Sequence, residues 1–381
     1  MQPSHLRLCL VSISALVVLV LAGCKPRQEG GQQEGAGASQ TITHSTSYDW
    51  LAAQQNEDGS FSNPEFPAMT ALALQALHTA RDSKYAPVID KAVAFVLTHV
   101  QPNGGIYTPI PNRRGGGLAN YNTAICMTAL ASLNHPDLTP VLLNARAFMA
   151  ESQELNDGDF KGGFGYDRDN DRAYADITNT SFALEAMRAT QKLEDERPAG
   201  QDKVDINWEA ALSFVEGLQN NADSGAHNAG GFHYTYNDAR WGAETNTVQT
   251  VGGTEERVVF RSFGSVTYQG ILSMIHCQLS QRDPRVIAAL EWCERHWTLD
   301  ENAGAGQQGI YFFYNIMARA LSAAKADEIE TPEGRIAWRM ELAEKLASLM
   351  LADGTWLNES ARFMENDPVL VTAYVLIALA Q

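Results

Sequence analysis

Six apolar runs of similar sequence decide how this chain folds. They are MTALALQAL (69–77), NTAICMTAL (122–130), NTSFALEAM (179–187), VTYQGILSM (266–274), YNIMARAL (314–321) and VTAYVLIAL (371–379). When the runs are aligned on their final pair, the leading positions are Thr70, Thr123, Thr180, Thr267, Tyr314 and Thr372. The runs lack proline and are apolar nearly all round, which predicts helices buried inside the protein.

A second pattern precedes most of these runs. An aromatic residue is followed five or six positions later by Gln, as in Phe148 and Gln153, and then by a turn rich in glycine and aromatic residues. Such turns are Asp58-Gly59-Ser60-Phe61, Gly104-Gly105-Ile106-Tyr107, Gly162-Gly163-Phe164-Gly165-Tyr166, Gly230-Gly231-Phe232-His233-Tyr234, Gln308-Gly309-Ile310-Tyr311 and Asp353-Gly354-Thr355-Trp356. Glycine permits the positive φ of a tight turn. We expect the aromatic side chain to fill the gap between helical hairpins and Gln to bond the turn backbone.

Together the two patterns define a repeating unit of one outer helix, one turn and one inner helix. Neighbouring hairpins must stack, because none can bury both of its faces alone. The sequence therefore predicts an all-α fold in which six hairpins close into a ring, with the unit at 48–80 against the unit at 338–381. One polar insertion, residues 237–261, interrupts the repeat.

The start of the chain predicts export and lipid attachment. The apolar run from Leu8 to Ala22 is short for a membrane span and suits a signal sequence. It ends in Leu21-Ala22-Gly23-Cys24, which resembles the lipobox of bacterial lipoproteins. That resemblance implies a signal peptide over 1–23, cleavage before Cys24 and acylation, including palmitate, at that residue. An uncleaved N-terminal anchor is the alternative.

The lipobox also implies a place in the cell. The protein would belong to the bacterial envelope, with the membrane as its partner through Cys24. Lys25 after the cysteine favours the outer membrane, with the protein facing the periplasm. Residues 24–47 are rich in Gly and Gln and predict a flexible tether before a toroid over 48–381.

Composition excludes one class of partner. Lys and Arg number 28 against 45 Asp and Glu, so the formal net charge is −17. A nucleic-acid-binding surface needs clustered basic residues, and we therefore expect no nucleic-acid partner.

The Gln and Gly-aromatic turns resemble the repeats of squalene cyclases and of protein prenyltransferase β subunits, over residues 48–381. The segments Phe263–Tyr268, Thr298–Asn302 and Asp367–Tyr374 look more like a group of bacterial prenyltransferase and squalene-oxidase-repeat proteins. The resemblance implies an α/α toroid around a central cavity. Fold alone does not fix function, which depends on the site.

The catalytic centres of both families are not recognisable. The cyclase segment Asp-x-Asp-Asp-Thr aligns with Asp176-Ile177-Thr178-Asn179-Thr180, which places Thr178 at the position of the proton donor. A prenyltransferase zinc site needs Asp, Cys and His together. The nearest candidates are His276-Cys277 and Cys293 with His296, for which a zinc site, a disulfide and two buried thiols are all open.

The acidic loop Asp167, Asp169 and Asp171 is a weak calcium candidate. Its spacing matches the start of an EF-hand loop, but Arg172 and Thr178 occupy the positions of the required Gly and Glu. A solvated acidic loop is the alternative. No other cofactor is predicted.

We expect the first turns of the inner helices to form the cavity rim. The candidate ligand-binding residues there are Tyr121, Asn122, Asp176, Asn179, Tyr268, Tyr311, Tyr314 and Tyr374. Aromatic residues with a few polar groups suit an apolar ligand. Helix capping explains Asn122 and Asn179 equally well.

Three functions are compatible with this sequence. The first is an envelope lipoprotein that binds an isoprenoid-like or other apolar ligand, with or without modifying it. The second is a non-catalytic scaffold that contacts a protein partner through its outer face or the 237–261 insertion. The third is a carboxylate-dependent enzyme acting on glycans, for which Asp167, Asp169 and Asp176 are the clustered acids. Whether the protein is an enzyme stays open at this stage.

Overall fold

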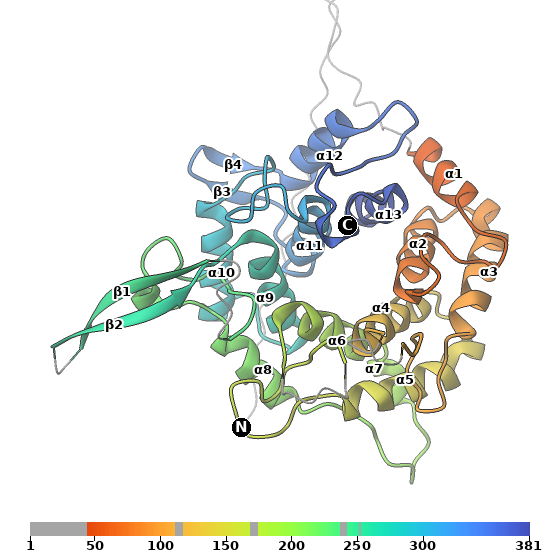
Figure 1. Ribbon diagram of the computed structural model, residues 1–381, viewed down its shortest axis with the longest axis horizontal. Coiled ribbons are helices and arrows are strands. Elements are labelled where there is room, and N and C mark those ends of the chain that lie inside the picture. The colour runs from red at the N-terminus through yellow and green to blue at the C-terminus, as the bar shows by residue number, and fades with distance from the viewer. Residues whose placement is uncertain (1–43, 111–116, 168–173, 237–241, 251–252) are drawn as a thin grey trace, which may run out of the picture. The chain divides into compact units, whose positions relative to one another are not determined.

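A computed structural model describes residues 44–110, 117–167, 174–236, 242–250 and 253–381. Within this part of the chain, six inner helices form a closed ring (Figure 1). They are α2 (Pro67–Thr79), α4 (Ala119–Ser132), α6 (Ile177–Ala189), α9 (Gly264–His276), α11 (Ile310–Ala323) and α13 (Pro368–Leu379). Each packs on the next in chain order, and α13 packs on α2. Most of their residues are buried, as the uniformly apolar runs predict.

A second layer of helices covers the outside of the ring. It consists of α1 (Ser45–Ala53), α3 (Ala86–Leu97), α5 (Thr139–Glu151), α8 (Trp208–Gly217), α10 (Pro284–Arg295) and α12 (Trp338–Leu349). A short helix, α7 (Gln191–Asp195), follows α6. The predicted all-α toroid of six hairpins is thus confirmed.

The repeated Thr fastens each inner helix to its preceding turn. Thr180 Oγ1 accepts a hydrogen bond from the Phe164 N–H at 3.0 Å. The same bond recurs at 2.8–3.0 Å for Thr70, Thr123 and Thr267, which accept from the N–H groups of Phe61, Ile106 and Phe232. All four turn residues are completely buried, so they fill the gaps between hairpins as expected.

The repeated Gln ties three of the units to the next, through Gln55, Gln153 and Gln219. Gln153 Nε2 donates to the carbonyl of Gly162 in its own turn at 2.9 Å, and to that of Asn207, just before α8, at 3.0 Å. Gly162 itself has φ +95°, and a Cβ there would lie 1.9 Å from the Ala210 carbonyl oxygen. Only glycine fits this contact between turn and outer helix.

The fifth and sixth units depart from this pattern. In the fifth, Gly309 adopts a left-handed conformation and starts α11 directly, while the Tyr314 hydroxyl donates to the Leu299 carbonyl at 2.6 Å. In the sixth, the Thr372 hydroxyl is buried and has no hydrogen-bond partner within the described part of the chain. The repeat is therefore similar in shape but not identical in bonding.

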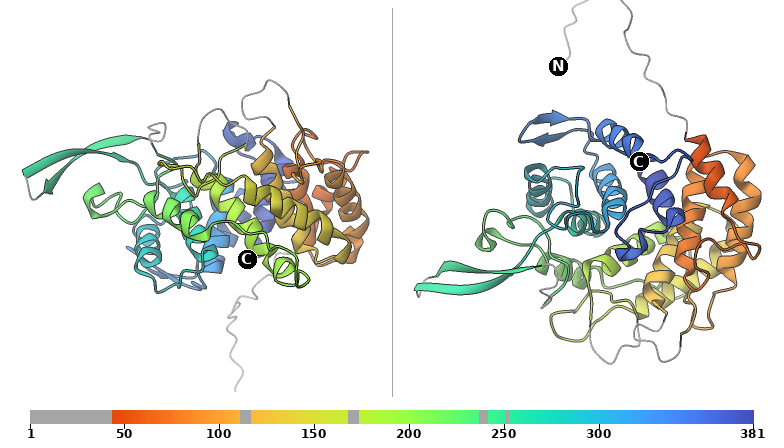
Figure 2. Two further views of the ribbon diagram at one scale, coloured as in Figure 1. Left: turned by 90° about the horizontal axis from the view of Figure 1, so that it is seen from below. Right: turned by 45° about the horizontal axis from the view of Figure 1, so that its top comes forward.

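The polar insertion forms a β-hairpin. Strands β1 (Ala243–Thr250) and β2 (Gly253–Phe260) pair antiparallel and project away from the ring beside α10 (Figure 2). A smaller hairpin, β3 (Ile329–Thr331) and β4 (Gly334–Ile336), lies between α11 and α12. Apart from these pairs, the described elements are helical.

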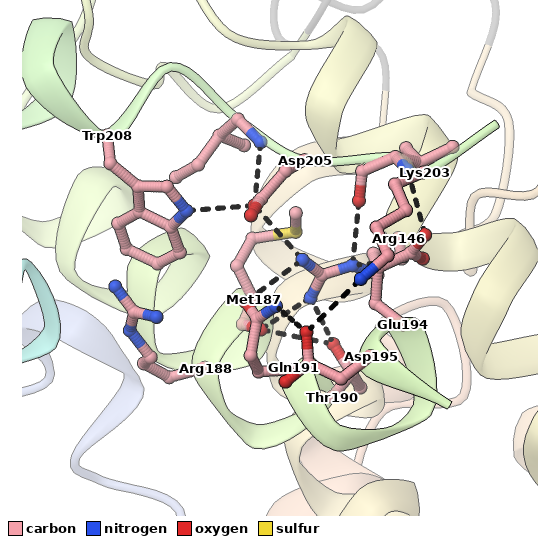
Figure 3. Close-up of polar contacts among 12 residues, drawn as sticks. Arg146, Met187, Arg188, Thr190, Gln191, Glu194, Asp195, Lys203, Asp205 and Trp208 are labelled. Atoms are coloured by element: carbon pink, nitrogen blue, oxygen red, sulfur yellow. Dashed lines mark hydrogen bonds and ion pairs between the residues drawn. The ribbon is translucent and has the colours of Figure 1, made fainter. Parts of the chain in front are cut away.

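A buried arginine holds the third unit together (Figure 3). Arg146 on α5 has no exposed side-chain surface and forms ion pairs with Glu194 at 3.4 Å and Asp205 at 3.0 Å. Its guanidinium also donates to the Met187 carbonyl at the end of α6. This network joins α5, α6, α7 and the segment before α8.

The first and last units meet to close the ring. Ser47 at the start of α1 donates to the Gly354 carbonyl at 2.6 Å, and Ser62 donates to the Asp367 carboxylate. No helix within the described residues is long and apolar enough to span a membrane. The predicted signal peptide, the tether up to residue 43 and Cys24 lie outside the described residues.

Candidate functional site

A cavity of about 210 Å³ lies within the ring at the N-terminal ends of the inner helices. Its wall receives residues from all six of these helices or the segments that lead into them. The described lining consists of Phe66, Ala68, Met69, Leu72, Leu118, Tyr121, Tyr166, Thr178, Phe182, Tyr234, Phe263, Ser265, Val266, Asn302, Gln308, Gly309, Phe312, Phe363, Met364, Leu370 and Tyr374.

Aromatic side chains dominate this wall, and nine of the described lining residues are Phe or Tyr. Phe182 and Phe312 reach toward one another from α6 and α11, with ring centroids 6.2 Å apart. The rings of Tyr121 and Phe182 form a T-shaped pair, with centroids 5.6 Å apart. Among the described lining residues there is no Asp, Glu, Lys, Arg or His. Such a wall suits an apolar ligand.

Four of the eight described lining residues with polar side chains are tyrosines. The Tyr166 and Tyr234 hydroxyls lie 3.2 Å apart, and Tyr121 and Tyr374 interact with one another in the same wall. Asp176 is fully buried and interacts electrostatically with Tyr234. Burial raises the pKa of Asp176 to about 6, although hydrogen bonds to its carboxylate oppose that shift.

Every inner helix has a side-chain acceptor on one of its first N–H groups. The acceptors are Asn122 for α2, Asp167 for α4, Asp176 for α6, Asn302 for α9, Glu365 for α11 and Asp367 for α13. The N···O distances lie between 2.7 and 3.0 Å. Carboxylates at helix N-termini are favoured by the helix dipole. The site is therefore surrounded by helix ends that the protein itself has capped.

An ion pair crosses the ring beyond the cavity. Arg319 of α11 bonds to Glu185 of α6, two helices that are separated in the ring by α9. Both residues lie further along their helices than Phe312 and Phe182, which line the cavity. Burial lowers the pKa of Arg319 to about 10, which leaves it charged at neutral pH.

The predicted binding residues divide into three groups. Tyr121 and Tyr374 line the cavity. Asn122, Asp176 and Asn179 are buried at helix starts, where Asn122 caps α2 and the Asn179 amide donates to the Asp176 carboxylate at 2.8 Å.

The third group is buried away from the lining. Tyr314 donates to the Leu299 carbonyl, and Tyr268 interacts electrostatically with Cys293. Tyr311 packs against the Tyr314 ring with centroids 5.8 Å apart.

The described cysteines and histidines do not gather into a metal centre. Cys126, Cys277 and Cys293 carry free thiols, and no three His, Cys, Asp or Glu side chains within the described residues cluster as metal ligands. His296 bonds to His227 at 3.1 Å. In the acidic loop, Asp167 accepts from the Ala119 N–H at 2.9 Å, while Asp169 and Asp171 lie outside the described residues.

Sequence reasoning missed several residues of this site. Tyr166 and Tyr234 occupy the same position of two Gly-Gly-Phe-x-Tyr turns, and that shared pattern could have identified them. Glu365 and Asn302 cap helices from neighbouring units, a contact that no local pattern reveals. Thr178 does line the cavity, and its hydroxyl donates to Gln269 Oε1 at 2.9 Å.

Solved structures share this architecture. One is the alpha-1,6-mannanase GH76A of Salegentibacter sp. HEL1_6, with a TM-score of 0.55, 11% identity, and coverage of 88% of this chain and 98% of that chain. Another is the Candida albicans protein geranylgeranyltransferase-I complexed with GGPP, with a TM-score of 0.51, 14% identity, and coverage of 89% and 90%. No protein-family model and no curated protein matches the sequence.

The closed double ring and these neighbours define the chain as an α/α toroid. At such identities the likeness establishes the fold and leaves activity to the site.

Proposed function

We propose that this protein binds an isoprenoid-like or other apolar ligand in the cavity at the N-terminal ends of its inner helices. The observation that carries the proposal is the lining, which is built from aromatic and aliphatic side chains of all six units. Buried apolar surface supplies roughly 25 cal/mol per Å² of favourable free energy to an apolar ligand. A few tyrosine hydroxyls would orient that ligand.

The site supports ligand binding better than cyclase or glycosidase chemistry. A cyclase acid must protonate a carbon–carbon double bond, and Thr178, whose hydroxyl bonds Gln269, stands at the corresponding position. Solved variants of the mannanase with two consecutive aspartates replaced are described as inactive. This chain contains no two consecutive aspartates. The Asp176 carboxylate caps the N-terminus of α6. No carboxylate belongs to the described lining of the cavity.

Binding can be tested with the full chain in lipid nanodiscs and radiolabelled geranylgeraniol. We expect saturable binding of one ligand per chain. Val266→Trp should abolish it, because Val266 lines the cavity and is buried. Val258→Trp is the matched control, since Val258 lies on β2 and is 64% exposed. Equal binding by both variants, with both folded by circular dichroism, would contradict the proposal.

We further propose that the toroid is held at the envelope by a lipid on Cys24. The lipobox-like Leu21-Ala22-Gly23-Cys24 supports this, as does the apolar run before it. Cells grown with a clickable palmitate should label the protein, and its intact mass should lack residues 1–23. Cys24→Ser should remove the label, and Cys9→Ser, in the segment expected to be cleaved off, should leave the label in place. A labelled Cys24→Ser variant would count against the anchor.

The β1–β2 hairpin favours a second candidate function, contact with a protein partner. The ribbon projects from the ring, and most of its described side chains are exposed. A photo-cross-linking residue at Val258 should capture a defined neighbour in intact cells, whereas one at the exposed Met340 on α12 should not. Identical cross-linking from both positions would argue against a hairpin-specific partner.

A further inference from the structure

The cavity lies where six helix N-termini converge, which is ordinarily an arrangement that attracts anions. Each N-terminus carries the positive end of a helix dipole, and unpaired N–H groups there bind phosphate well. A prenyl diphosphate or a fatty acid would be the expected ligand of such a place if the N–H groups were open. The described side chains around this cavity show a different arrangement.

Protein acceptors already occupy these helix ends, and four of the six are carboxylates. Asp176 and Glu365 are the most enclosed of the four, with no exposed surface on either residue. Burial raises the pKa of both side chains. The carboxylates at these helix ends would repel an anionic head group, and within the described lining no cationic side chain is present to offset its charge.

Arg319 does not offset the repulsion between these carboxylates and an anionic ligand. Its guanidinium is bonded to Glu185 and lies beyond the aromatic pair Phe182 and Phe312. The pair is neutral as a unit, so it offers little attraction to an anion. Breaking it to pair Arg319 with a ligand would leave the Glu185 charge uncompensated.

The cavity does provide partners for an uncharged oxygen. The hydroxyls of Tyr166 and Tyr234 form a pair in its wall, and the hydroxyls of Tyr121 and Tyr374 belong to residues of the same wall. A hydroxyl group is both a donor and an acceptor, so a paired tyrosine can still accept a further hydrogen bond. Asp176 is fully buried and interacts electrostatically with Tyr234 of this pair. A donor such as an alcohol would then bond to a tyrosine oxygen of the pair.

We propose that the cavity selects uncharged apolar molecules that carry one hydroxyl group, such as isoprenoid alcohols, over the corresponding diphosphates. The hydroxyl is held by the Tyr166–Tyr234 pair, and the apolar chain lies among the aromatic side chains. This inference rests on the proposed binding function and specifies its ligand class.

Competition against radiolabelled geranylgeraniol tests the ligand class. Full-length protein in nanodiscs is titrated with unlabelled geranylgeraniol, geranylgeranyl diphosphate or phytane, a hydrocarbon of similar size without oxygen. We expect the diphosphate and the hydrocarbon each to compete at least about tenfold more weakly than the alcohol, the difference that one good hydrogen bond or charge penalty makes. A diphosphate that competes as well as the alcohol would overturn the inference.

Two conservative variants locate the hydroxyl contact. Tyr234→Phe should weaken geranylgeraniol binding by about five- to tenfold and leave phytane binding unchanged, because the ring remains and the hydroxyl is lost. Tyr107→Phe is the control, since the Tyr107 hydroxyl bonds Asn103 outside the lining. Equal effects on alcohol and hydrocarbon would overturn the inference while leaving apolar binding intact. Absence of saturable binding by every ligand would instead overturn the proposed function itself.

Discussion

Asp176 shows how one residue serves both the helix and the cavity. Its carboxylate accepts from the Asn179 backbone N–H and from the Asn179 amide, each at 2.8 Å. It also interacts electrostatically with Tyr234 in the cavity wall. The residue is completely buried, so the charge of its carboxylate is costly even though these bonds reduce the cost.

The stability of the protein should respond to the protonation of Asp176. Its pKa is about 6 when folded, against an ordinary value of 3.8. Between these values the folded state binds more protons than the unfolded state, so the free energy of unfolding falls as pH rises. Asp176→Asn keeps a capping side chain but does not titrate. Its stability relative to wild type should therefore improve from pH 4 to pH 8, by up to about 3 kcal/mol.

Urea unfolding at the two pH values measures this change. Asp137→Asn, at a side chain that is 88% exposed, is the control and should show no such trend. A difference between Asp176→Asn and wild type that is the same at both pH values would contradict the prediction.

Arg146 is expected to matter for stability and not for ligand binding. Arg146→Met removes the guanidinium from the network with Glu194 and Asp205, and Glu194 is 1% exposed. Removing one partner of a buried ion pair costs about 3–5 kcal/mol. Arg197 still bonds Glu194, so we expect the lower end of that range. Chemical denaturation measures the loss in the free energy of unfolding. Arg257→Met is the control, because the Arg257 side chain is 46% exposed. Similar losses for the two variants would be inconsistent with this role.

At the scale of the element, the repeat is a device for fastening turns to inner helices. Thr180 accepts the N–H of the buried Phe164, and the same bond recurs in three other units. The sequence predicts the helices, the turns and the role of Gln, because these depend on residues close together in the chain. It does not predict that Asn302 caps α9 or that Glu365 caps α11, because both contacts cross between units.

The repeat provides an internal control for its own bond. Thr180→Val leaves the buried Phe164 N–H without its acceptor and should cost about 1–3 kcal/mol. Thr372 has the same place in the sixth unit, but its buried hydroxyl has no partner among the described residues. Thr372→Val should therefore be neutral or stabilising. In thermal melts, Thr180→Val should therefore have a lower melting temperature than Thr372→Val. Equal destabilisation by the two substitutions would refute the assigned role of the threonine.

For the whole molecule, the ring depends on contact between its ends. The pattern of six runs was sufficient to predict closure, since an open array would leave apolar faces exposed. The position of the cavity was predictable only in part. Tyr121 and Tyr374 belong to its wall, whereas Tyr268, Tyr311 and Tyr314 do not, because helical phase and neighbouring side chains decide which face each residue presents.

Closure can be tested by truncation. Removing residues 338–381 deletes α12 and α13, including the surfaces that pack on α1 and α2. The truncated chain should aggregate or lose its cooperative melting transition, because the faces of α2 and α11 that α13 covers become exposed. Analytical ultracentrifugation and calorimetry report these outcomes. A soluble truncation with a sharp transition would contradict a ring that depends on closure.

The Arg319–Glu185 pair bridges α11 and α6 further along these helices than the cavity-lining Phe312 and Phe182. At the cavity itself, Phe363 and Met364 belong to the lining and are 50% and 41% exposed. Both residues adopt left-handed backbone conformations, with φ of 60° and 62°. A molecule that enters beside these two residues would contact them before the buried part of the wall, so substitutions there should change the rates of binding and release.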